Sequence, residues 1–384
     1  MNLQKKNVKQ IYNLPDETVF CKKCVVSNQR PRIVLDEKGI CNACNNYERK
    51  KNINWQDREK EFKDLLDKYR RNDGRFDVIV PSSGGKDSSV VAHRLKFDYN
   101  MNPLTVTWSP HVYTDIGFEN FQGLIKAGLS NILGTPDGKV HRKLTRDSFI
   151  TMGEPFQPFI YGQSSFPMQV AVNYNVPLIM DGENGEEEYG GAANSNQKSF
   201  SLEDEVKYWQ SNVPAEKWLE DGYTMNELSF YFPPSIDRIK KTKINRQFWS
   251  YYFPWNPQEH YYYSVENTYF KANPDGRSEG TYSKYASLDD RIDGFHYYLM
   301  FLKFGIGRAT SDAAHEVRDG HISREEGVEL VRRFDGEFPK KFFKLFLDYC
   351  SITEEDFWEI CETWRAEHIW IKKENNWVLK SQVE

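Results

Sequence analysis

The chain has 384 residues, of which 28% are charged, and its formal net charge is -5. This length is enough for two or three domains. No apolar run is long enough to span a membrane, and residues 1–10 hold three lysines without an apolar core, which excludes a typical secretory signal. We therefore expect a cytoplasmic protein, and the acidic balance argues against a nucleic-acid partner.

Two Cys-x-x-Cys pairs lie near the N-terminus and are separated by sixteen residues. This spacing is typical of a structural zinc site, because each pair forms a tight turn with both thiolates pointing inward. Disulfides are the alternative, but they are rare in a protein without an export signal. Residues 1–54 are therefore predicted to form a zinc-binding module. The expected Zn²⁺ ligands are Cys21, Cys24, Cys41 and Cys44.

A glycine-rich turn follows the apolar run at residues 76–80 and precedes a segment of helical composition at 90–96. A strand, a glycine-rich turn and a helix together aim backbone N–H groups at an anion. Asp87 would repel phosphate unless a cation lay between them, so it implies Mg²⁺. An ordinary serine- and glycine-rich turn is the alternative. The predicted phosphate-binding residues are Ser83, Gly84, Gly85, Lys86, Asp87, Ser88 and Ser89.

The sequence Ser-Gly-Gly-Lys-Asp-Ser at residues 83–88 lacks the spacing of a Walker loop. It resembles the pyrophosphate loop (PP-loop) of the ATP pyrophosphatase superfamily. The resemblance implies an α/β fold with a Rossmann-like parallel sheet in residues 55–198. It also implies that ATP is cleaved between its α and β phosphates and that AMP is transferred to a substrate oxygen.

Further strands are expected at residues 103–108, 131–134 and 176–180, separated by helices. Alternating strands and helices predict a parallel sheet, in which ligands bind beyond the carboxyl ends of the strands. The end of the second strand lies beside adenine in the superfamily that the loop resembles. The acidic stretch after residue 180 is a candidate for holding Mg²⁺, and a solvated acidic loop is the alternative. The candidate residues at these ends are Trp108, Gly182, Glu183 and Glu187.

Residues 199–285 are rich in aromatic side chains and interrupted by prolines, so we interpret them as an insertion over the nucleotide domain. Their rings could stack on a sugar, pack in a core or form a dimer contact. Residues 286–384 are predicted to form a helical region that completes the active site. Lys303 and Arg308 flank a second glycine-rich turn there and could neutralise phosphate charge.

The cysteine pairs, the loop and three later motifs at residues 113–117, 181–185 and 303–310 follow one another in the chain. This succession, over about residues 21–339, resembles the N-acetyl sugar amidotransferases. That family converts an acetamido group into an acetamidino group on bacterial surface sugars, such as lipopolysaccharide O-antigens and pseudaminic acid. The resemblance implies ATP, Mg²⁺ and Zn²⁺ as cofactors. The residues expected to act in catalysis are Asp87, Glu183, Lys303 and Arg308.

The expected substrate is an N-acetylated sugar or nucleotide sugar, which ammonia attacks after adenylylation. Asn2 follows Met1, and no cysteine lies in a strand-to-helix elbow, so we expect no glutaminase activity in this chain. The resemblance suggests a separate glutaminase and a barrel-type partner similar to the cyclase subunit of histidine biosynthesis. A homodimer is possible.

A tRNA 2-thiolation enzyme with the same kind of loop is the main alternative. Such an enzyme usually needs further cysteines near the nucleotide domain and a basic face for RNA. No cysteine lies between Cys44 and Cys350, and the chain is acidic. A non-catalytic ATP-binding protein and an enzyme that uses a different nucleophile on the same activated sugar are further alternatives.

Overall fold

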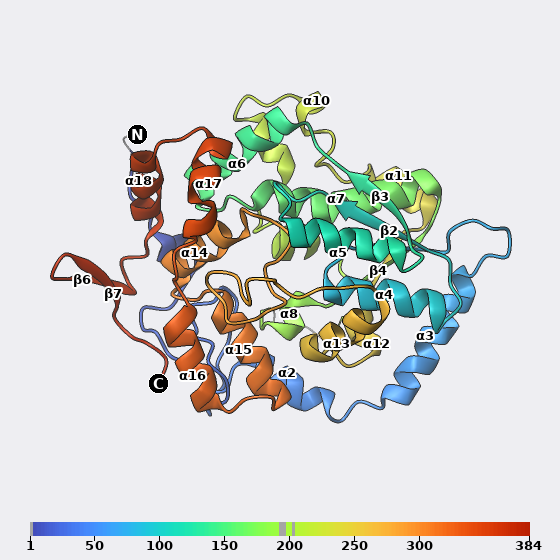
Figure 1. Ribbon diagram of the computed structural model, residues 1–384, viewed down its shortest axis with the longest axis horizontal. Helices are drawn as coiled ribbons and strands as arrows, with labels where there is room; N and C mark the ends of the chain where they lie inside the picture. Colours follow the sequence, from blue (N-terminus) through green and yellow to red (C-terminus); the bar gives the residue numbers. More distant parts are fainter. Residues whose placement is uncertain (1–2, 192–196, 202–203) are drawn as a thin grey trace.

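The computed structural model describes residues 3–191, 197–201 and 204–384. Its centre is a five-stranded, all-parallel sheet in the order β3-β2-β1-β4-β5, which confirms the predicted α/β class (Figure 1). The strands are β1 (Val78–Pro81), β2 (Pro103–Trp108), β3 (Ser130–Gly134), β4 (Leu178–Asp181) and β5 (Asn245–Phe248).

The order of the strands reverses beside β1. The chain runs outward from β1 through β2 to β3 and then returns to place β4 on the other side of β1. Val78 is in register with Pro103 of β2 and with Leu178 of β4. Connections therefore leave β1 and β4 in opposite directions, and a crevice opens beyond their carboxyl ends, where ligands of such sheets bind.

Alternate residues of the central strands enter two different cores, as the period of two in a strand requires. Val78 and Val80 pack in one cluster, whereas Ile79 packs in the other. The first face is covered by α3 (Trp55–Tyr69), α4 (Lys86–Phe97) and α5 (Asp115–Lys126). The second face is covered by α6 (Gly138–Met152) and α7 (Gln157–Tyr174).

The cysteine module contains α1 (Val8–Tyr12) and α2 (Asn42–Lys50). It lies against the C-terminal helices α15 (Arg308–Asp319) and α16 (Arg324–Phe334), so the two ends of the sequence are neighbours in space (Figure 1). The Arg324 guanidinium donates to the carbonyl oxygens of Cys24 (3.2 Å) and Cys21 (3.3 Å). The module is therefore attached to the C-terminal helices through the turn that contains its first cysteine pair.

The aromatic-rich region contributes β5 to the central sheet, a strand that the sequence analysis did not predict. Its residues are mostly polar, and Arg246 is buried only because two carboxylates pair with it. Many of the aromatic rings of the region serve as core: Trp249, Tyr252 and Trp255 pack under α3 and α4. Its helices are η1 (Glu205–Trp209), η2 (Ala215–Leu219), α10 (Met225–Leu228), α11 (Ile236–Thr242), α12 (Trp249–Tyr252) and α13 (Pro257–Asn267).

The C-terminal region is helical, as predicted, and ends in an antiparallel hairpin that projects at the left of Figure 1. Glu374 and Asn375 have positive φ angles of 47° and 68°, which is the backbone of a tight two-residue hairpin turn. The elements are α14 (Asp293–Phe304), α15 (Arg308–Asp319), α16 (Arg324–Phe334), η3 (Lys340–Phe342), α17 (Phe343–Cys350), α18 (Glu354–Trp364), β6 (Trp370–Lys373) and β7 (Asn376–Leu379).

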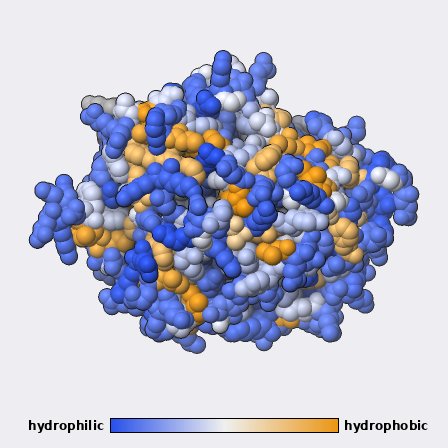
Figure 2. Space-filling model, in the orientation of Figure 1, coloured by the Kyte–Doolittle hydropathy of each residue, from blue (hydrophilic) through white to orange (hydrophobic). Residues whose placement is uncertain are grey.

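The molecular surface seen in Figure 2 is largely hydrophilic, with hydrophobic residues in several patches separated by polar ones. Within the described ranges, no helix is long and apolar enough to cross a membrane. The boundaries at residues 54, 198 and 285 stay predictions.

Candidate active site

The predicted phosphate-binding residues 83–89, called the phosphate loop below, follow β1 and run into the first turn of α4. One residue of this loop has a backbone conformation that only glycine adopts easily. Gly84 has a φ of +88°, and a Cβ atom there would lie 2.6 Å from Cα of Phe121 in α5. Gly85 has an ordinary φ of −65° and is the N-cap of α4 without a side-chain cap. Ser82 accepts a hydrogen bond from the Gly84 N–H (3.4 Å) and contacts the Ser88 hydroxyl (2.9 Å). The first N–H groups of α4 are thus available to an anion.

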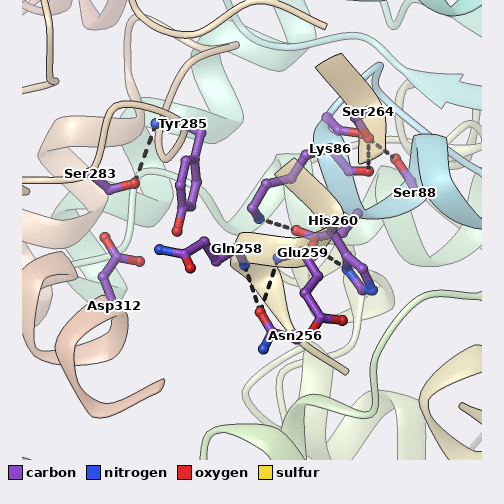
Figure 3. Close-up of polar contacts among 12 residues, drawn as sticks. Lys86, Ser88, Asn256, Gln258, Glu259, His260, Ser264, Ser283, Tyr285 and Asp312 are labelled. Atoms are coloured by element: carbon purple, nitrogen blue, oxygen red, sulfur yellow. Dashed lines mark hydrogen bonds and ion pairs between the residues drawn. The ribbon is translucent and has the colours of Figure 1, made fainter. Parts of the chain in front are cut away.

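Helix α13 holds the first turn of α4 in place (Figure 3). Asp87 contacts Lys86 Nζ through one carboxylate oxygen (2.5 Å) and His260 Nδ1 through the other (2.9 Å). Ser264 Oγ donates to the Lys86 carbonyl (2.8 Å), and Lys86 Nζ lies 5.3 Å from the ring centre of Tyr285. Burial opposes ionisation of Asp87, but the charge of Lys86 and the contact with His260 outweigh it and lower the pKa of that carboxyl.

A cavity of ≈ 600 Å³ opens beyond the carboxyl ends of the sheet, at the strand reversal. The phosphate loop forms one wall through Ser83, Gly85, Asp87 and Ser88. Trp108 after β2 and residues 181–183 after β4 form another part. The cavity therefore joins the predicted phosphate loop to the predicted acidic stretch, two segments about a hundred residues apart in the chain.

Glu183 lies at this cavity together with Asp87. Burial, and then the negative charge of Asp87, raise the pKa of Glu183 to about 7. Two carboxylates at one cavity are a donor set suited to a hard divalent cation with oxygen ligands. These two residues fit a Mg²⁺ ion bound with nucleotide phosphates.

Trp108 and Gly182 line the same cavity, and each takes part in a close contact between a glycine and an indole ring. A Cβ atom on Gly162 would lie 1.9 Å from the Trp108 ring, so the indole packs directly on the backbone of α7. A Cβ atom on Gly182 would lie 2.9 Å from the Trp255 ring. Trp108 is 4% exposed, and its ring lies among Phe166, Phe230 and Tyr231.

A buried ion cluster lies at the wall of the cavity beside β5. Arg246 donates to both oxygens of Asp181 (2.6 and 3.0 Å) and to Glu205 (3.1 Å). Burial raises the pKa of Glu205 to about 7, although Arg246 opposes this shift. The guanidinium also lies 4.4 Å from the ring centre of Trp209, which lines the cavity next to Tyr208. The Arg246 guanidinium of this cluster therefore packs on Trp209, a residue of the cavity wall.

Arg308 lies near the phosphate loop, whereas Lys303 and Glu187 lie elsewhere. Arg308, the first residue of α15, lines two smaller cavities together with Lys86 and Asp87. Lys303 is buried in α14, with its Nζ 3.8 Å from a Glu154 oxygen. Neither Lys303 nor Glu187 is a lining residue of the three cavities around the loop.

Glu187 instead faces the cysteine module. It forms ion pairs with Arg49 and with Lys50 (3.8 Å), both in α2. It belongs to α8 (Gly185–Glu188), a single helical turn that directs adjacent carboxylates to different sides. Glu186 of the same turn reaches the cavity and pairs with Arg32. The sequence could not tell which of these neighbouring glutamates faces the ligand.

Two histidines at the site were not predicted. His260 contacts Asp87, and His296 lines the cavity with its Nδ1 2.6 Å from Glu154, 142 residues away in the chain. Burial opposes protonation of His296, but Glu154 outweighs it and raises the pKa of the imidazole. No local sequence pattern connects either histidine to its carboxylate, so only folding reveals them.

The four N-terminal cysteines come together as predicted. Their sulfur atoms all lie within 4.8 Å of one another and are buried. The Cys21–Cys44 and Cys24–Cys41 sulfur pairs are separated by 3.9 and 3.7 Å. A tetrahedral zinc ion with Zn–S bonds of about 2.3 Å requires S–S distances of about 3.8 Å. The cluster therefore fits a closed, structural zinc site.

A match to a known family lies in the C-terminal part of the chain. Residues 279–384 match the family described as "LPS biosynthesis protein WbpG-like, C-terminal domain". The match fits the amidotransferase family that the motifs resemble. This WbpG-like region includes Arg308, His296 and Asp289, so it contributes to the walls of all three cavities around the loop.

Comparisons with solved structures and with curated proteins add little beyond this match. A predicted subunit of a tRNA methyltransferase from Methanocaldococcus jannaschii is 17% identical, with a TM-score of 0.26, covering 49% of this chain and 74% of that chain. An NH3-dependent NAD synthetase from Campylobacter jejuni is 18% identical, with a TM-score of 0.28, covering 50% and 93%. No curated protein matches the chain.

Proposed function

We propose that the protein is an ATP-dependent, AMP-forming amidotransferase that converts a sugar acetamido group into an acetamidino group. The proposal includes a role in the synthesis of bacterial surface glycans such as lipopolysaccharide. One observation carries it: the phosphate loop and a pair of acidic side chains share one cavity at the reversal of a parallel sheet. The WbpG-like match of residues 279–384 supports the choice of pathway.

In this proposal the loop binds the pyrophosphate end of ATP. The N–H groups at the start of α4 and the hydroxyls of Ser83 and Ser88 donate to phosphate oxygens, and Lys86 balances their charge. Asp87 and Glu183 hold Mg²⁺, which neutralises phosphate charge when bound. Arg308 lies near Lys86 and offers a further positive charge to the departing pyrophosphate.

The chemistry proceeds in two displacement steps. The amide oxygen of the sugar attacks the α-phosphorus, so an O–P bond forms and pyrophosphate leaves. Ammonia then attacks the activated carbon, a proton is lost, and the C–O bond breaks as AMP departs with the former amide oxygen. The protein positions the reactants and neutralises charge, so no protein nucleophile is required.

The acceptor occupies the remainder of the cavity. Tyr208 and Trp209 offer ring faces of the kind that stack on sugars, and Gln163 offers an amide. Ammonia comes from a separate glutaminase associated with a cyclase-like barrel. These partners, and a homodimer, are parts of the proposal that rest on the family resemblance alone.

The tRNA 2-thiolation alternative finds less support. A sulfur-transfer enzyme needs a reactive, accessible thiolate, and reactive cysteines have a low pKa. Cys350 and Cys361 are buried in the C-terminal helices, and burial raises the pKa of both thiols. The four remaining cysteines form the buried cluster whose geometry fits zinc.

The experiment that tests the proposal is product analysis. The purified protein is incubated with ATP, Mg²⁺, an ammonium salt and a panel of N-acetyl sugars and nucleotide sugars. We expect sugar-dependent formation of AMP and pyrophosphate and a sugar product lighter by about one mass unit, since O is replaced by NH. Formation of AMP only with tRNA and a sulfur donor would support the alternative, and ADP with phosphate would refute the loop assignment.

A further inference from the structure

The cysteine module supplies two arginines, Arg30 and Arg32, to the wall of the large cavity. Their electrostatic surroundings differ. Arg32 donates two hydrogen bonds to Glu186 (2.9 and 2.5 Å), a bidentate pair that leaves it largely neutralised. Within the described ranges, Arg30 forms no ion pair: its Nε donates to the uncharged carbonyl of Gly190 (3.2 Å).

Arg30 is nevertheless held in a fixed position. Its backbone N–H donates to Ser27 (3.3 Å), its carbonyl accepts from Ile33 (3.1 Å), and its guanidinium lies 5.6 Å from the ring centre of Tyr189. The nearby charges are Glu186, already bound by Arg32, and Arg32 itself. Burial lowers the pKa of Arg30. An arginine stays charged in proteins, so a cation lies at this cavity without a carboxylate bound to it.

The other cations at or near the cavity each have a carboxylate partner. Arg246 is satisfied by Asp181 and Glu205, and Lys86 by Asp87. Lys86 at the start of α4 and Arg308 at the start of α15 line a smaller cavity beside the loop. Arg30 enters from a different element and lines the cavity together with Tyr208 and Trp209. Its free guanidinium nitrogens can form a forked pair with a planar or tetrahedral anion.

We propose that Arg30 of the cysteine module is a substrate-binding residue that binds an anionic group, a phosphate or a carboxylate, of the acceptor sugar. This inference rests on the proposed function, because it assumes that ATP uses the loop and that the acceptor uses the rest of the cavity. The metal module then contributes directly to substrate recognition, in addition to its structural role.

Equilibrium binding tests this proposal without requiring turnover. The zinc-loaded protein is saturated with Mg²⁺ and the α,β-methylene analogue of ATP, and three probes are titrated by calorimetry: UDP, N-acetylneuraminate and N-acetylglucosamine. UDP carries phosphates, N-acetylneuraminate carries a carboxylate, and N-acetylglucosamine is neutral. We expect R30A to bind at least one anionic probe roughly ten- to a hundredfold more weakly than the wild type, because a hydrogen-bonded charge pair is lost.

The comparison of probes identifies the anion, and matched variants separate binding from folding. K38A removes an exposed cation of the same module and should bind every probe as the wild type does. R30K should restore part of the affinity, since it returns the charge but not the fork. The proposal is overturned if R30A binds both anionic probes normally, if the wild type binds neither, or if R30A loses the ATP analogue instead. Product analysis with ATP decides the proposed function separately.

Discussion

The phosphate loop and the cysteine module contribute to one cavity in different ways. The loop acts through its backbone, in a continuous segment whose conformation is set by Gly84 and by the start of α4. The module acts through side chains, Arg30 and Arg32, which lie between the two cysteine pairs and face α8. We therefore expect ATP binding by the loop to depend on local backbone conformation. We expect acceptor binding by the module to depend on tertiary contacts that a bound metal stabilises.

Removal of the metal should have the largest effect, and this effect should differ between the two regions. A chelator, or C44S, should unfold the module, because zinc supplies about 10–16 kcal/mol of folding free energy in comparable small domains. Arg49 and Lys50 then release α8, and Arg30 leaves the cavity. We expect acceptor binding to be lost before binding of the ATP analogue. Metal content measured by emission spectrometry, together with calorimetry, checks this, and equal loss of both ligands would contradict the distinction.

The loop can be broken without touching the module by G84A. The substitution combines a positive φ with a contact of 2.6 Å to the backbone of Phe121. We expect a loss of about 3 kcal/mol in unfolding free energy and loss of AMP formation, with zinc content unchanged. G85A is the matched control for stability, because Gly85 has a normal φ and the atom nearest to a new Cβ is Ser83 Oγ at 3.5 Å. Similar melting temperatures for the two variants would refute the strain argument.

A third comparison concerns the two cations predicted from the second glycine-rich turn. R308M should slow AMP formation by about ten- to a hundredfold, because a charge near the departing pyrophosphate is removed. K303M should affect the rate much less, since Lys303 pairs with Glu154 away from the loop. Steady-state kinetics with ATP and acceptor checks both variants. A larger rate loss in K303M would restore Lys303 as a catalytic residue.

The smallest expected effect concerns the ion cluster at β5 and its dependence on pH. The pKa of Glu205 is about 7 in the folded protein, above its ordinary value of 4.5, so the folded state binds the proton more tightly than the unfolded state. Stability should therefore fall as the pH rises from about 4.5 to 7 and then level off. E205Q should remove this decline. Denaturant unfolding between these pH values measures it, and an unchanged slope would contradict the assignment.

Short segments with strong local preferences were predictable. The loop, the cysteine pairs and four of the five strands depend on contiguous residues, so spacing and apolar periodicity identified them. The strand β5 escaped prediction because its sequence is polar, and its burial depends on the carboxylates of Asp181 and Glu205. Sequence patterns report the intrinsic preferences of a segment, not the partners that override them.

The sequence by itself determined the parallel sheet, the phosphate loop and the four-cysteine cluster, because each is governed by backbone geometry or ligand spacing within a short stretch. Only the tertiary structure decided which charged side chains meet at the cavity. It placed Arg30 there from the N-terminal module and His296 from α14, and it turned Glu187 and Lys303 elsewhere. The physical reason is that a side chain's direction depends on how its helix or turn packs, and contacts between distant residues form only when the whole chain has folded.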